Sequence, residues 1–90
     1  MSYTVTRTPA AERRLTELWL ESHARRAIAD AANAIDTALA TNPNRIGESR
    51  VLGTRILFVP PLGVLYSTNE QDRTVRVLTV WRFETHDDTE

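Results

Sequence analysis

The hydrophobic period of this chain changes from helical to strand-like at Asn42-Pro43-Asn44. Before this point, over residues 24–41, apolar residues recur every three or four positions, as in a helix with one buried face. After it, apolar and polar residues alternate through several short runs, as in β-strands. A proline disfavours helical geometry in the residue before it, so the helix is predicted to end here. The chain therefore combines a helical part with a β part.

The first part is predicted to be a short strand followed by two helices. Residues 3–7 alternate and are rich in β-branched and aromatic side chains, which favours a strand. Thr8 is suited to cap a helix over residues 9–22, because Pro9 then takes the first helical position. The expected core positions of the two helices, which we expect to pack as an antiparallel hairpin, are Ala11, Leu15, Leu18 and Trp19, then Ile28, Ala31, Ala32, Ile35, Ala38 and Leu39.

The second part is predicted to contain four strands, over residues 48–52, 55–59, 64–68 and 74–83. The short loops between the later runs, including Pro60-Pro61-Leu62-Gly63, are typical of antiparallel hairpins. The predicted order is β-α-α-β-β-β(β). This is an α+β fold in which an N-terminal helical hairpin packs on one face of an antiparallel sheet, with residues 1–83 forming one domain.

The charge of the chain is unevenly distributed. Its 90 residues have a net charge of −1, yet residues 84–90 contain four acidic residues and no base. We expect these seven residues to be an acidic tail without fixed structure. Subtracting their four acids leaves 11 arginines against 8 acids, or +3, in residues 1–83. Because phosphate neutralisation dominates affinity for nucleic acids, this modest charge argues against strong direct nucleic-acid binding.

Composition excludes several other classes of site. The chain has no cysteine, so it has neither disulfides nor a thiolate metal site. Its two histidines and scattered carboxylates lack the spacing of metal ligands, and we predict no metal and no cofactor. No apolar run approaches the roughly 18 residues that span a bilayer, and the first residues do not resemble a signal peptide. We therefore expect a cytoplasmic protein with no membrane partner.

Four local motifs, in this order, carry a resemblance to a known family. They are the strand leading into Thr8-Pro9-Ala10-Ala11-Glu12-Arg13-Arg14-Leu15, the link Asn42-Pro43 with Ile46-Gly47-Glu48-Ser49-Arg50, the strand Gly63-Val64-Leu65-Tyr66, and the final run Val77-Leu78-Thr79-Val80-Trp81-Arg82. Over residues 3–83 the chain resembles the RelE/ParE superfamily, the toxins of type II toxin–antitoxin systems. The Asn-Pro link to glycine and arginine is closer to ParE-like members.

The resemblance implies a toxin that arrests growth, contributes to plasmid stabilization and is held inactive by a cognate antitoxin protein. Some members of the superfamily cut messenger RNA on the ribosome, whereas ParE-like members poison DNA gyrase. Three hypotheses follow for this chain: a toxin that binds a cellular target such as DNA gyrase, a ribosome-dependent endoribonuclease, or a non-toxic protein-binding module. Because fold alone does not choose between them, whether the chain is an enzyme stays open.

Metal-independent RNA cleavage requires a base, an acid and a cation. The residues available for these roles are Arg55, Tyr66 and Arg82, with Glu84 and His86 just beyond. Regular alternation along the last strand places Arg76 and Arg82 on one face with Leu78 and Val80. We therefore expect Arg50, Arg55, Tyr66, Arg76 and Arg82 to converge on a concave sheet surface.

The cleaving members usually carry an arginine in the strand that ends in tyrosine, and the corresponding segment of this chain, residues 61–64, has none. This departure favours binding over cleavage. The candidate partner-binding residues are Arg50, Leu62, Arg76 and Trp81.

Overall fold

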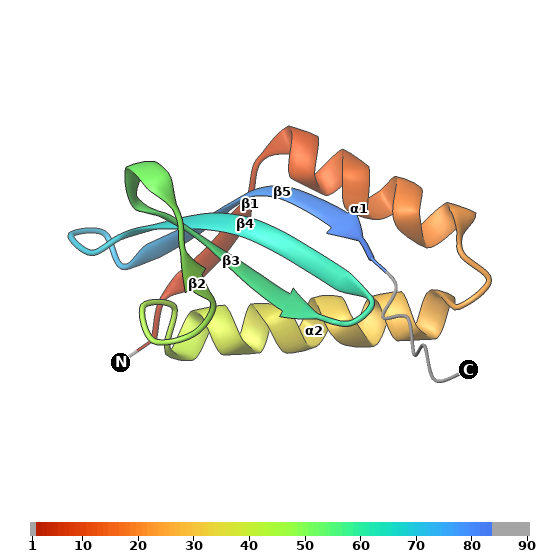
Figure 1. Cartoon of the computed structure of the whole chain (residues 1–90), viewed down its shortest axis with the longest axis horizontal. Helices are drawn as coiled ribbons and strands as arrows, with labels where there is room; N and C mark the ends of the chain where they lie inside the picture. The colour runs from red at the N-terminus through yellow and green to blue at the C-terminus, as the bar shows by residue number, and fades with distance from the viewer. Residues whose placement is uncertain (1, 84–90) are drawn as a thin grey trace.

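The computed structural model describes residues 2–83, which form a five-stranded sheet with two helices (Figure 1). Strand β1 (Thr4–Arg7) leads into α1 (Pro9–Glu21), and α2 (Arg25–Thr41) follows after a short turn. The β part then begins with the two-residue β2 (Glu48–Ser49) and a 3₁₀ turn, η1 (Val51–Gly53). It ends with β3 (Thr54–Val59), β4 (Leu62–Asn69) and β5 (Thr74–Arg82).

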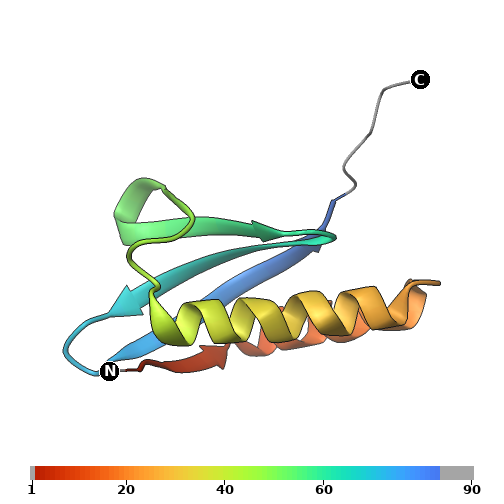
Figure 2. The same cartoon turned by 90° about the horizontal axis from the view of Figure 1, so that it is seen from below.

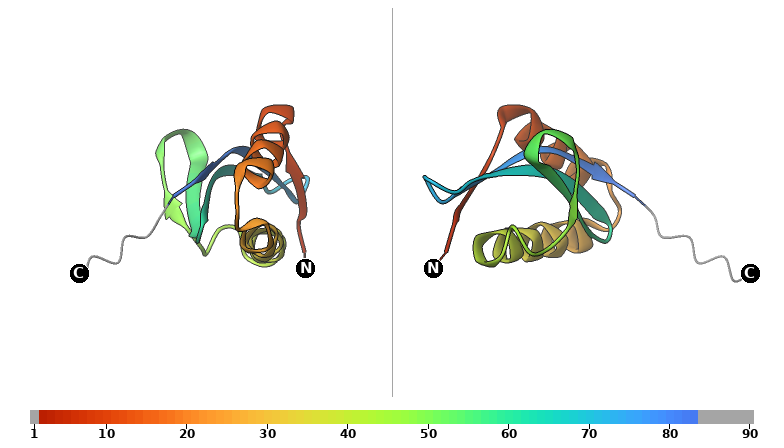
Figure 3. Two further views of the ribbon diagram at one scale, coloured as in Figure 1. Left: turned by 90° about the vertical axis from the view of Figure 1, so that its right-hand side faces the viewer. Right: turned by 60° about the vertical axis from the view of Figure 1, so that its left-hand side comes forward.

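The strands lie in the order β1-β5-β4-β3-β2. All neighbouring pairs are antiparallel except β1 and β5, which run parallel and close one edge of the sheet. Both helices lie on the same face of the sheet and leave the other face uncovered (Figures 2 and 3). The predicted α+β fold with a helical hairpin on one face is therefore confirmed.

The strand boundaries differ from the prediction by more than one residue at two places. The strand predicted over residues 48–52 ends at Ser49, because residues 51–53 form the 3₁₀ turn. Strand β4 begins at Leu62, two residues earlier than predicted, since Val59 already pairs with Leu62 across a turn of only two residues. The Pro60–Pro61 peptide bond in that turn is cis.

Helix α1 starts as its sequence predicts. The Thr8 hydroxyl oxygen accepts a hydrogen bond from the backbone N–H of Ala11 at 3.1 Å, and Pro9 occupies the first helical position. The same hydroxyl donates to the backbone carbonyl of Leu78 at 3.2 Å. This residue therefore fixes the start of α1 against the middle of β5.

The core lies between the helices and the covered face of the sheet. Its buried apolar residues are Ala11, Leu18, Ile28, Ala31, Ile35, Leu39, Leu62, Val64, Tyr66, Val75, Val77 and Val80. The predicted apolar stripe of α2 is confirmed at the four positions that are buried, Ile28, Ala31, Ile35 and Leu39. The expected core position of Trp19 is wrong, because its side chain is 39% exposed. Helix α1 packs mainly across β5, and Leu18 takes the buried position beside it.

Within residues 2–83, no helix is long and apolar enough to cross a membrane. The same residues contain no cluster of three or more side chains suited to hold a metal ion.

Candidate functional site

The arginines predicted to share one face of β5 lie on opposite faces. Strands β4 and β5 change register between Leu65 and Tyr66, whose partners are Thr79 and Val77, so Leu78 is an extra residue in β5. Arg82 pairs with Leu62 on the helix-covered face. Arg76 pairs with Ser67, which is an odd number of residues from Leu62 and so points to the uncovered face. The predicted convergence of these arginines is therefore wrong.

Tyr66 is buried, and its hydroxyl is already occupied. Its side chain has no exposed surface, and its O–H lies 2.7 Å from the carbonyl oxygen of Pro43 and 3.0 Å from that of Ile46. Burial raises the pKa of the Tyr66 hydroxyl, and the adjacent Arg55 guanidinium partly opposes that rise. The tyrosine therefore holds the link between α2 and β2 against the sheet.

Arg55, on the neighbouring strand β3, holds the same link. It pairs with Tyr66 across the two strands, and its Nε donates to the carbonyl of Ile46 at 2.9 Å. A second nitrogen of the guanidinium donates to the carbonyl of Gly47 at 3.2 Å. Of the three predicted catalytic residues, the fold therefore brings Arg55 and Tyr66 together. Both side chains donate hydrogen bonds to backbone carbonyls of residues 43–47.

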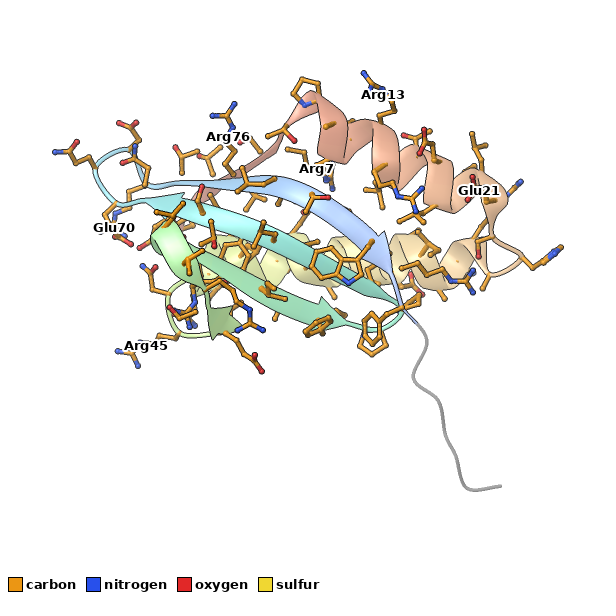
Figure 4. All side chains as sticks on the ribbon, turned by 45° about the horizontal axis from the view of Figure 1, so that its top comes forward. Arg7, Arg13, Glu21, Arg45, Glu70 and Arg76 are labelled. Atoms are coloured by element: carbon orange, nitrogen blue, oxygen red, sulfur yellow. The ribbon has the colours of Figure 1, made fainter. Side chains whose placement is uncertain are left out.

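The remaining predicted residues are dispersed. Arg50 forms an exposed ion pair with Glu48 at 3.0 Å, and Arg76 projects from β5 into solvent (Figure 4). Leu62 is only 1% exposed, so it lies in the core rather than on a contact surface. Arg82 is exposed at the end of β5. Glu84 and His86 lie outside the described residues.

An aromatic cluster occupies one end of the uncovered sheet face. The ring of Phe58 meets Trp81 edge-on at 6.0 Å and Phe83 at 5.0 Å between centroids. Phe58 is 46% exposed and lies near the end of β3, beyond the residues that pair with β2. Trp81 was predicted as a contact residue from the sequence. Phe58 was not, although strict alternation places it on the face opposite to Leu57 and Val59.

A second apolar surface lies between the helices. A groove of about 270 Å³ is lined by Leu15, Thr16, Trp19, Ile28, Ala29, Ala32 and Asn33. The guanidinium carbon of Arg25 lies 4.7 Å from the centroid of the Trp19 ring, where a cation is attracted to the ring face. Because α1 packs on the sheet more than on α2, the apolar side chains between the helices stay accessible. We call these residues the interhelical groove.

Arg7 forms an ion-pair cluster at the covered face. Its guanidinium lies 2.9 Å from a carboxylate oxygen of Asp36 on α2 and 3.0 Å from one of Glu12 on α1. Burial raises the pKa of the Asp36 carboxyl, and the charge of Arg7 opposes this rise. The cluster joins both helices to β1 and has a structural role.

No family profile matches the sequence, and no characterised relative is found by sequence. A chain of the RelBE2 toxin–antitoxin complex from Mycobacterium tuberculosis matches the fold with a TM-score of 0.75 at 28% identity, covering 91% of this chain and 92% of that one. The chain has the fold of the RelE/ParE superfamily of toxins.

Two further solved structures share this fold. A chain of the chromosomal ParDE system of Pseudomonas aeruginosa has a TM-score of 0.72 at 16% identity, covering 91% of this chain and 97% of that one. A chain of the archaeal RelE–RelB complex from Pyrococcus horikoshii has a TM-score of 0.58 at 16% identity, covering 96% of this chain and 100% of that one. Because RelE and ParE complexes both match, the preference for ParE-like members stays a prediction from the sequence.

Proposed function

We propose that this protein is the toxin of a type II toxin–antitoxin system, which acts in the cytoplasm by binding a cellular protein and is neutralised by a cognate antitoxin. The similarity to a chain of the RelBE2 complex over nine-tenths of both chains carries this proposal. Two uncovered apolar surfaces on a chain of 90 residues support it, because surfaces of this kind mark contact sites for partners.

The interhelical groove suits the antitoxin. An amphipathic helix binds a groove by placing apolar side chains at helical spacing along it, and Leu15, Trp19 and Ile28 line this groove from both helices. Arg25 at its edge supplies a positive charge for a carboxylate of the antitoxin. The aromatic cluster on the uncovered sheet face offers a second contact for the remaining length of the same partner.

The arrangement of the arginines and Tyr66 supports binding rather than cleavage. A nuclease of this size requires its acid, base and cation within reach of one phosphate. Here Arg76 and Arg82 point to opposite faces, and the Tyr66 hydroxyl is buried against two backbone carbonyls. We therefore favour a protein target of the DNA gyrase class, as in ParE-like members, over messenger RNA on the ribosome.

Expression in a bacterial host tests the proposal. The chain expressed alone should arrest growth, and the product of a small neighbouring gene should restore it and co-purify. Gyrase inhibition is measured by DNA supercoiling, and message cleavage by primer extension. Cuts that disappear in Arg82→Ala would establish the ribonuclease instead. Co-purification with the neighbour but no growth arrest would identify a non-toxic binding module.

A charge placed in the groove tests where the antitoxin binds. Trp19→Glu should remain toxic but should no longer be rescued, because the carboxylate is desolvated when a helix covers it. The matched control is Ala27→Glu, at an exposed position of the same hairpin that does not line the groove. Rescue of the Trp19 variant as efficient as that of the control would place the antitoxin elsewhere.

A further inference from the structure

The turn between β2 and β3 exposes two adjacent apolar side chains at one end of the molecule. Val51 is 78% exposed and Leu52 is 96% exposed, more than any other large apolar residue among those described. We call these two residues the apolar tip. In Figure 1 the turn that carries the tip lies at the upper left, far from the turn between α1 and α2 at the right. It is thus separate from both apolar surfaces discussed above.

The apolar tip is held in one shape by its own backbone. The N–H of Arg50 donates to the carbonyl of Thr54 at 2.7 Å, which closes the turn. The carbonyl of Val51 then accepts both the backbone N–H and the hydroxyl of Thr54, the latter at 2.8 Å. Because the turn is fixed before any contact, little conformational freedom remains to be lost on binding.

Among residues 2–83, neither backbone preference nor burial accounts for the leucine at the tip. Leu52 has φ 59° and ψ 32°, a left-handed conformation that glycine or asparagine adopts far more easily than leucine. Its side chain is almost wholly in solvent and so contributes no burial. Strain of this kind concentrates at sites that act on another molecule.

The charge around the tip indicates what the partner presents. Residues 45–55 contain three arginines and one carboxylate: Arg50 pairs with Glu48, and Arg55 donates to the carbonyls of Ile46 and Gly47, so the segment keeps a net positive charge. Arg45 is exposed at this end of the molecule (Figure 4) and forms no ion pair with any residue in the range 2–83 that the structure describes. A partner surface with carboxylates around an apolar centre would complement this arrangement.

We propose that the apolar tip binds a preformed apolar pocket with an acidic rim on the folded cellular protein that the toxin acts on. This inference rests on the proposed function. A convex tip requires a concave, folded receptor, whereas the antitoxin is expected to lie as a segment in the concave groove. The toxin therefore contacts its target and its antitoxin through two separate surfaces.

Leu52→Asn tests this inference, because asparagine accepts the left-handed conformation and removes the apolar group. Growth arrest should weaken by about tenfold or more, as expected for the loss of a central apolar contact. Co-purification with the antitoxin and the melting temperature should not fall. The matched control, Leu20→Asn on α1, removes another exposed leucine (56% exposed) and should keep full toxicity. Growth arrest at the wild-type level in Leu52→Asn, or loss of antitoxin binding, would overturn the proposal.

Photocrosslinking makes the test independent of toxicity. A benzophenone amino acid is placed at position 52 and, as a control, at exposed position 71 in the turn between β4 and β5. We expect one host protein to crosslink from position 52 and not from position 71. The crosslinked peptide of that protein should be apolar and flanked by carboxylates. Excess wild-type chain should prevent the crosslink, whereas excess Leu52→Asn should not. Crosslinks to the antitoxin, to a second copy or to nothing would contradict the proposal. Absence of growth arrest in the wild type would count against the proposed function, and crosslinking would still decide the role of the tip.

Discussion

Gly63 of β4 lies directly beneath the indole of Trp81 on β5. The two residues pair across the strands, and a Cβ atom on Gly63 would lie 2.7 Å from Cε2 of the indole. Phe58 pairs with the same glycine from β3 and meets the indole edge-on. The missing side chain at position 63 therefore lets the ring lie flat on the sheet and sets the shape of the aromatic cluster.

Gly63→Ala should displace the indole and disrupt the aromatic cluster. We expect a loss of about 1–2 kcal/mol in the free energy of unfolding, because the added methyl group forces the ring away from β4. Urea denaturation measures this loss, and tryptophan fluorescence in a Trp19→Phe background reports the environment of Trp81. In a Trp81→Val background the same substitution should cost clearly less. An equal cost in both backgrounds would show that the strain lies in the backbone.

Tyr66→Phe should reduce stability without reducing toxicity. The substitution leaves the carbonyls of Pro43 and Ile46 without the hydroxyl, at an expected cost of about 1–2 kcal/mol. Tyr3→Phe is the control, because the Tyr3 hydroxyl binds Glu70 at the surface and its removal should change stability little. Chemical denaturation and growth-arrest titration are compared for both variants. Toxicity lost by Tyr66→Phe, at an expression level where the folded protein persists, would instead support a catalytic hydroxyl.

The first part of the chain was predictable because its signals are local. The cap at Thr8 and the stripe of α2 depend on residues within a few positions of each other. The side chain of Trp19 could not be placed in this way, since its exposure depends on how α1 sits between β5 and α2. Periodicity shows which face of a helix is apolar but not how far a neighbouring element covers it.

The candidate site was predicted less well because of one residue in β5. The run from Val75 to Trp81 is apolar on both faces, so no polar side chain marks the alternation on either side of Leu78. The extra residue there reverses the face of every later side chain, including Arg82. The role of Tyr66 was equally hidden, because its hydroxyl binds carbonyls 20 and 23 positions away in the sequence.

The Arg7–Asp36 pair should make the stability of the fold depend on pH. Burial raises the pKa of Asp36, so folding favours the neutral form of this carboxyl. The resulting contribution to the free energy of unfolding is lost as pH rises through the pKa that Asp36 has in the folded protein. Removing the opposing charge of Arg7 should increase this effect. Arg7→Met is therefore expected to cost about 1 kcal/mol near neutral pH and clearly less just below 3.8, the ordinary pKa of the group.

Urea denaturation at the two pH values measures the effect of Arg7→Met. The pH-dependent part should shrink when Asp36→Asn is added, and what remains reports the exposed partner Glu12. Arg14→Met is the surface control, because its pair with Glu17 is exposed. A cost of Arg7→Met that is the same at both pH values would assign it to lost packing of the arginine stem.

Leu52→Asn should stabilise the folded chain. Left-handed backbone costs a leucine about 1–2 kcal/mol, and asparagine tolerates it, so relief of about 0.5–1 kcal/mol is expected. The neighbouring Gly53 has φ 75° and open space around it, so Gly53→Ala should be destabilising through backbone strain alone. Thermal and urea unfolding of both variants measure the two changes. Opposite signs are expected at these adjacent positions, and a destabilised Leu52→Asn would mean that the exposed leucine supports the fold.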